Sequence, residues 1–156
     1  MSSEVERALL DAARLAQAED VLVLGDGPLV FAAHERVGDG WVYVVRSQVD
    51  ELEELLSQAH RVGASGVAYL VGEAPVLPLP NGSVAAAVGR IATEDGALPA
   101  AAAELRRVLG PEGRVALAAA GSRAAEALAG ALAAAGFATV EVVPAGGESL
   151  VSGRLR

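Results

Sequence analysis

The stretch "VLVLGDGPLV" at residues 21–30 carries the clearest chemical signal, because an apolar run leads directly into Gly25-Asp26-Gly27. A strand that ends in Gly-x-Gly usually brings the backbone close to a bound nucleotide, since glycine has no Cβ to hold a ligand away. Pro28 and Leu29 follow where a third glycine would be expected. The turn therefore indicates a nucleotide-type site at 25–27.

Arg46 is the second candidate, because it ends the next predicted strand. It lies ~20 residues after Gly25, the spacing at which an acid contacts the ribose in nucleotide-binding folds. Arginine has five donors and no acceptor, so Arg46 cannot accept the ribose protons. Asp50 and Glu51 follow about one helical turn later and could replace such an acid, although their geometry does not favour it. An arginine there suits a phosphate, such as the 2′-phosphate of NADP, although nothing else supports a hydride-transfer enzyme.

Few other side chains are arranged for chemistry. His34 and His60 fall on separate predicted helices and cysteine is absent, so there is no metal-ligand spacing and we expect no metal. The residues Thr93, Glu94 and Asp95 in "ATEDG" could orient a substrate, although a solvated turn explains them more simply. The sequence therefore assigns no catalytic residue.

The elements that would position these residues alternate between helix and strand, with apolar residues at helical spacing or in short β-branched runs. Ser47 and Ser122 are the predicted N-caps of two helices, and the tail "FATVEVVPAGGESLVSGRLR" predicts a hairpin. Repeated units of a strand followed by a helix indicate a mostly parallel sheet covered by helices on both faces. The expected helices span 3–18, 28–36, 48–62, 99 to Gly110 and 122 to about Gly136, and the expected strands 21–24, 41–45, 67–71, 84–88 and 114–119.

Composition narrows the class of protein. The 156 residues suit one domain spanning 1–156, and 53 % of them are hydrophobic, as in a globular protein. No apolar run reaches the roughly 18 residues that cross a bilayer, and "MSSEVERALL" carries acids where a signal peptide needs basic residues. The net charge of −8, without a basic cluster, argues against nucleic acid as a partner. We expect a soluble cytoplasmic protein with no membrane or nucleic-acid partner.

Four segments carry a family resemblance over nearly the whole chain: "VLVLGDG", "GEAPVLPLPNGSVAAAV", "AAAELRRVLGPEGRVAL" and "LAAAGFATVEVV". In this order they resemble the class I S-adenosylmethionine-dependent methyltransferases, especially the small-molecule branch that methylates ubiquinone and menaquinone. The resemblance implies a Rossmann-like, doubly wound seven-stranded α/β sheet of order 3-2-1-4-5-7-6, with strand 7 antiparallel and helices on both faces. It places S-adenosylmethionine over the carboxyl ends of strands 1 and 2.

The resemblance also implies a cofactor site. In that family, the glycine turn lies at the methionine end of the cofactor, and an acid after strand 3 lies near the adenine amino group. The residues after strand 4 lie beside the methyl-transfer site. An exposed loop acid is the alternative interpretation of Glu73. Leu29, Arg46 and Ala85 depart from the family on the cofactor side, replacing a glycine and two acids. The implied cofactor-binding residues are Gly25, Asp26, Gly27, Arg46, Glu73, Ala74, Gly89 and Arg90.

Two functions remain open at this point. One is S-adenosylmethionine-dependent methyl transfer to a small molecule. The other is a non-catalytic methyltransferase-fold protein that binds a protein partner or acts in regulation. The family generally builds its substrate pocket from added N-terminal helices or an insertion after strand 5, whereas this chain has one early helix and a bare "AAGS". We therefore expect a homodimer in which a second copy covers the open pocket.

Overall fold

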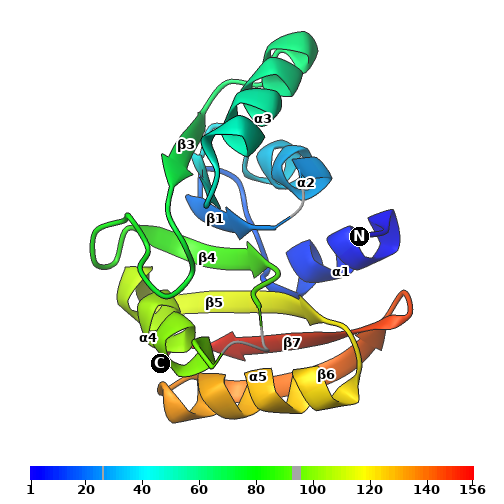
Figure 1. Ribbon diagram of the computed structural model, residues 1–156, viewed down its shortest axis with the longest axis vertical. Helices are drawn as coiled ribbons and strands as arrows, with labels where there is room; N and C mark the ends of the chain where they lie inside the picture. The colour runs from blue at the N-terminus through cyan, green and yellow to red at the C-terminus, as the bar shows by residue number, and fades with distance from the viewer. Residues whose placement is uncertain (26, 93–95) are drawn as a thin grey trace.

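A computed structural model describes residues 1–25, 27–92 and 96–156. Its centre is a seven-stranded sheet in the order β3-β2-β1-β4-β5-β7-β6 (Figure 1). Strands β1 to β5 run parallel, and β7 is antiparallel to both of its neighbours. This order confirms the fold inferred from the sequence. The strands are β1 Val21–Leu24, β2 Val42–Arg46, β3 Val67–Val71, β4 Val84–Gly89, β5 Leu109–Ala119, β6 Ala138–Ala145 and β7 Glu148–Arg154.

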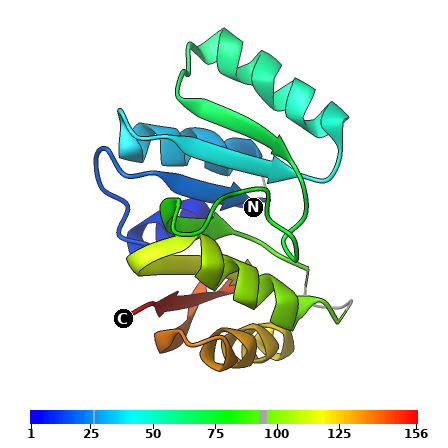
Figure 2. The ribbon, with the colours of Figure 1, turned by 90° about the vertical axis from the view of Figure 1, so that its left-hand side faces the viewer.

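Helices cover both faces of the sheet (Figure 1 and Figure 2). Helices α1, α2 and α3 pack on one face, and α4 and α5 pack on the other. The connection between β3 and β4, residues 72–83, is a loop rather than a helix. The helices are α1 Ser3–Ala12, α2 Gly27–Val37, α3 Val49–Val62, α4 Leu98–Val108 and α5 Ser122–Ala134.

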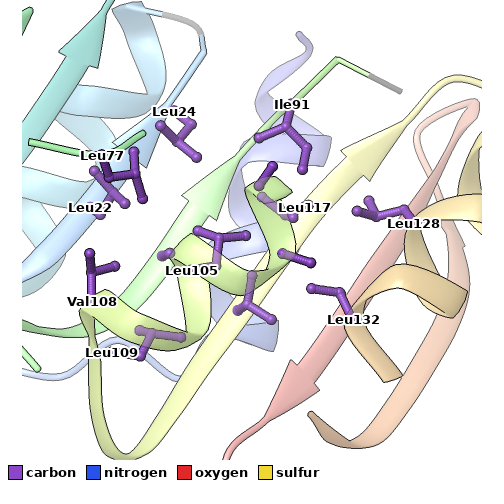
Figure 3. Close-up of a cluster of buried hydrophobic side chains, with 14 of the residues drawn as sticks. Leu22, Leu24, Leu77, Ile91, Leu105, Val108, Leu109, Leu117, Leu128 and Leu132 are labelled. Carbon is purple, nitrogen blue, oxygen red and sulfur yellow. The ribbon is translucent and has the colours of Figure 1, made fainter. Parts of the chain in front are cut away.

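Strand β1 illustrates why the sheet needs two helical layers. All four of its residues are buried. Because side chains alternate along a strand, Val21 and Val23 join the core under α1, α2 and α3, while the two leucines that alternate with them join the core under α4 and α5. Figure 3 shows the second core, where Leu105 of α4 and Leu128 of α5 lie near Leu117 of β5. The continuous apolar runs of the sequence are thus strands buried on both faces.

The two predicted serine caps are wrong. Helix α3 begins one residue later than expected, with extended Gln48 as its N-cap and without a side-chain cap hydrogen bond. Ser122 is the first residue of α5 rather than its cap, because the chain enters the helix through Gly121 at a φ of +98°. Only a side chain at the N-cap position can accept hydrogen bonds from the unpaired N–H groups of the first helical turn. In both helices the serine lies one residue away from that position.

Two further element boundaries differ from the prediction. Helix α1 ends at Ala12, and the chain leaves it through Arg14, whose φ is +52°. Strand β5 begins at Leu109, which pairs with Val84, and the regular register resumes only at Arg114. Residues 110–113 thus form an irregularity within β5 rather than a turn before it. None of the helices in the described part of the chain is both long and apolar enough to span a bilayer.

Candidate functional site

Two adjoining hollows lie at the carboxyl ends of the parallel strands, and together they form what we call the strand-end groove. The first has a volume of about 290 Å³ and is lined by residues that follow β1, β2, β3 and β4. The second, of about 540 Å³, lies between the start of α2 and α3. Gly25, Arg46 and Glu51 line both hollows. In the sheet order, β1 lies between β2 and β4, so the strand order reverses direction at β1. The groove therefore opens at this switch point.

Gly25 forms the turn that opens the groove beside β1. Its φ of +103° is a conformation that residues with a Cβ rarely adopt. The next chain segment runs close by, since the Arg90 N–H donates to the Leu24 carbonyl at 2.9 Å. A Cβ on Gly25 would lie 3.4 Å from both the nitrogen and the Cβ of Arg90. Glycine at this position is thus required by the backbone, and the predicted neighbour Asp26 lies outside the described residues.

Gly27 and Leu29 have structural roles that the sequence did not indicate. Gly27 lines only the second hollow, and a Cβ there would come within 2.9 Å of Leu55 Cδ2, at the end of a side chain of α3. Leu29 is fully buried in the core beneath α2. The expectation that its side chain fills cofactor space is wrong, because the helical turn directs Leu29 toward the sheet.

The residues of β4 divide between the two edges of the sheet. Ala85 lies near the amino end, where its N–H donates to the Asp20 carbonyl at 2.8 Å, so its predicted place on the cofactor side is wrong. Gly89 ends the strand with a φ of +133°, and a Cβ there would collide with the Leu24 carbonyl oxygen. Gly89 is buried and lines neither hollow. Gly89 lets the end of β4 approach β1 closely, and the next residue, Arg90, lines the first hollow.

Glu73 and Ala74 line the first hollow from the loop after β3. The Val76 N–H donates to the Glu73 carbonyl at 3.0 Å, which closes a tight turn around these residues. Glu73 itself is exposed. The structure therefore brings the predicted loop acid to the same hollow as Gly25, Arg46 and Arg90.

An ion pair on α4, Glu104–Arg107, holds this loop in place. Glu104 Oε1 lies 2.7 Å from Arg107 Nε, and Glu104 Oε2 accepts the Leu77 N–H at 2.8 Å. The Arg107 guanidinium donates to the carbonyls of Leu77 and Leu79 at 3.0 and 2.8 Å. The hydrogen bond from Arg107 lowers the pKa of Glu104, against the opposing effect of burial. This pair was not predicted from the sequence, although a Glu and an Arg three residues apart on a helix are a detectable signal.

Arg46 and Glu51 form the partition between the two hollows. Arg46 ends β2, its Nη1 donates to the Val45 carbonyl at 3.1 Å, and its own carbonyl accepts the Gly72 N–H at 2.9 Å. Glu51 reaches the groove from the first turn of α3, whereas Asp50 lines neither hollow. Of these two described acids, Glu51 is therefore the one that lines the groove.

The remaining candidates lie away from the groove or outside the described residues. His34 Nε2 lies 2.6 Å from the Ser65 carbonyl oxygen, and neither His34 nor His60 lines a hollow of the groove. Thr93, Glu94 and Asp95 are outside the described residues. Among residues that the structure does describe, no three His, Cys, Asp or Glu side chains gather into a group that could hold a metal ion.

Comparison with known proteins identifies the fold. No family model and no curated protein sequence matches the chain. Among solved structures, a SAM-dependent methyltransferase from Aquifex aeolicus matches with a TM-score of 0.83 and 22 % identity over 97 % of this chain and 89 % of that one. The chain has the fold of the S-adenosylmethionine-dependent methyltransferases.

Other neighbours show that this fold hosts more than one reaction. The geranyl diphosphate C-methyltransferase from Streptomyces coelicolor, solved with S-adenosyl-L-homocysteine, matches this methyltransferase-like chain with a TM-score of 0.82 and 15 % identity, over 97 % of this chain and 75 % of that one. The [4+2]-cyclase SpnF matches with a TM-score of 0.80 and 16 % identity, and the match covers 97 % of this chain and 79 % of SpnF. Likeness of fold alone therefore does not establish an activity for this chain.

Proposed function

We propose that this chain binds S-adenosylmethionine in the strand-end groove and transfers its methyl group to a small molecule. One observation carries the proposal: the groove lies at the switch point beside β1, and the wall of its first hollow combines Gly25, Glu73 and Arg90. Ligands of open α/β sheets bind at this point, outside the carboxyl ends of the strands. Solved neighbours of the same fold are named as S-adenosylmethionine-dependent enzymes.

The residues of the groove fit the cofactor. Gly25 would leave the backbone at this position accessible to the methionine part, and the side chain of Leu29 is buried and lines neither hollow. Glu73 offers a carboxylate to the adenine amino group, beside the small side chain of Ala74. Of the three departures noted in the sequence, Arg46 alone lines the groove in the described structure.

The bound cofactor would supply an electrophilic methyl group on a positively charged sulfur. The chain's own task is then to hold an acceptor in line with that methyl and to limit access of water. Arg90 and Ile91 line the part of the first hollow that follows β4, and they would orient the acceptor.

Calorimetric titration with S-adenosylmethionine tests the proposal. Wild type should bind, and Gly25→Ala should weaken binding at least tenfold, because the added Cβ strains the φ of +103° and crowds Arg90. Gly130→Ala on α5 is the matched control, since a Cβ there meets nothing within 4 Å. Circular dichroism should show that both variants are folded. Absence of heat and of any thermal stabilisation of wild type at millimolar cofactor would overturn the proposal.

A further inference from the structure

Glu51 occupies a position in the groove that calls for a chemical explanation. Its side chain lines the first hollow together with Glu73 and Arg90, and it also lines the second hollow together with Gly27 and Pro28. It thus lies on the partition between the end of β2 and the first turn of α3. A group on this partition can contact the middle of any elongated ligand that extends from Gly25 to Glu73.

The strand end beside Glu51 presents donors instead of acceptors. Arg46 is the last residue of β2, and its guanidinium carries N–H groups and no acceptor atom. One of its nitrogens, Nη1, donates to the Val45 carbonyl at 3.1 Å. Ser47, which follows β2 and also lines the first hollow, offers a neutral hydroxyl, so a carboxylate acceptor for a ligand hydroxyl at this point has to come from another element.

Other nearby acids are less suitably placed than Glu51. Asp50, the preceding residue of α3, lines neither hollow. Glu54 lines only the second hollow, and Glu73, in the loop after β3, lines only the first. Within the described part of the chain, Glu51 is the acid shared by both hollows. Its place in the first turn of α3 also favours a carboxylate, because the helix amino terminus is electropositive.

We propose that Glu51 accepts the hydrogen bonds of the cofactor's two ribose hydroxyls, replacing an acid at the end of β2. This inference rests on the proposed function, because it assigns a residue to the same ligand. Both oxygens of an ionised carboxylate are acceptors, so one side chain can serve two neighbouring hydroxyls. Arg46 then lies beside this carboxylate and offsets its negative charge in the groove.

Glu51→Gln tests the assignment, with Asp50→Asn as the matched control in the same helical turn. Binding of S-adenosylhomocysteine and of its 2′,3′-dideoxy analogue is measured by calorimetry for wild type and both variants. Glu51→Gln should weaken S-adenosylhomocysteine binding about tenfold or more, because it exchanges a charged acceptor for an amide. The same substitution should weaken binding of the dideoxy analogue less than about threefold, since the hydroxyls that Glu51 contacts are missing. Asp50→Asn should leave both affinities within about twofold of wild type.

The outcomes separate this inference from the proposed function. If wild type binds but Glu51→Gln behaves like Asp50→Asn, the ribose role is wrong and the proposed function stands. If Glu51→Gln weakens both ligands equally, Glu51 shapes the groove without contacting the hydroxyls, which also overturns the assignment. If wild type binds neither ligand, the proposed function fails and this inference fails with it.

Discussion

Arg90 Nη1 lies 2.6 Å from Glu148 Oε1, so an ion pair joins the residue after β4 to the first residue of β7. Because β7 is antiparallel to β5, its beginning lies at the edge where the parallel strands end. The two side chains are 35 % and 20 % exposed, and they are therefore partly shielded from water. The pair connects the wall of the first hollow to the carboxy-terminal hairpin.

Removing this pair should have a small, salt-dependent effect on stability. In a double-mutant cycle of Glu148→Gln and Arg90→Gln, we expect a coupling free energy of about 0.5–1 kcal/mol at low salt, because partly exposed ion pairs are weak. The coupling should shrink in 1 M NaCl, where charges are screened. Urea unfolding at low and high salt measures it. Additive effects of the two substitutions at low salt would contradict the pairing.

The Glu104–Arg107 pair predicts a pH dependence. Hydrogen bonding to Arg107 lowers the pKa of Glu104 in the folded protein below the ordinary value of 4.5. A carboxyl group whose pKa is lower in the folded than in the unfolded protein stabilises the fold at pH values above its pKa in the unfolded protein. This stabilisation disappears as the pH falls through its pKa in the folded protein.

Wild type should therefore unfold at a higher urea concentration than Glu104→Gln at pH 7, and the difference should shrink as the pH falls below 4.5. The control is Glu53→Gln, an exposed acid on α3, which should track wild type at every pH. A difference between wild type and Glu104→Gln that grows on acidification would show that the pair does not hold the loop.

Much of the fold could be predicted because its signals are local. Each buried strand is a short apolar run bounded by turn residues, and the Gly146-Gly147 turn indicates the terminal hairpin. The strand order then followed from the family resemblance of four segments. Helix boundaries were less predictable. They depend on which residue leaves the helical conformation, as Arg14 does after α1.

The sequence allowed a prediction of which strand ends form the site, but not of which side chains face it. Gly25, Arg46, Glu73 and Arg90 lie at the strand ends and line one hollow, whereas their binding of a cofactor stays a prediction. Whether a side chain faces the groove depends on helical rotation, and adjacent residues of a helix differ by about 100°. Asp50 and Glu51 are next to each other in the sequence and yet differ in whether they line the groove. The Arg90–Glu148 contact depends in addition on the register of a distant hairpin.

Leu29 supports the core rather than obstructing the groove, which predicts the effect of shortening it. Because the side chain is fully buried, Leu29→Ala should lower the free energy of unfolding by about 2–5 kcal/mol. It should not improve S-adenosylmethionine binding. Chemical denaturation and calorimetry measure the two quantities. Tighter cofactor binding without loss of stability would show that Leu29 does reach the groove.

Self-association stays a prediction, and exposed apolar residues beside the groove indicate where to test it. Val49 at the start of α3, Val71 at the end of β3 and Val76 in the following loop are 55 %, 53 % and 75 % exposed. Such apolar surface commonly marks an interface. We expect light scattering to find a dimer of wild type and a monomer of Val76→Asp. Val62→Asp, at the other end of α3, serves as the control and should remain a dimer. A strictly monomeric wild type at high micromolar concentration would exclude the homodimer.

The location of the bound ligand decides whether the strand-end groove is the cofactor site. The measurement is a crystal structure of the protein grown with S-adenosylhomocysteine at a concentration that saturates binding. We expect ligand density in the strand-end groove, in contact with Gly25, Glu51 and Glu73. Density at the opposite edge of the sheet, beside the Arg114–Glu19 ion pair, or an empty groove under these conditions would contradict it.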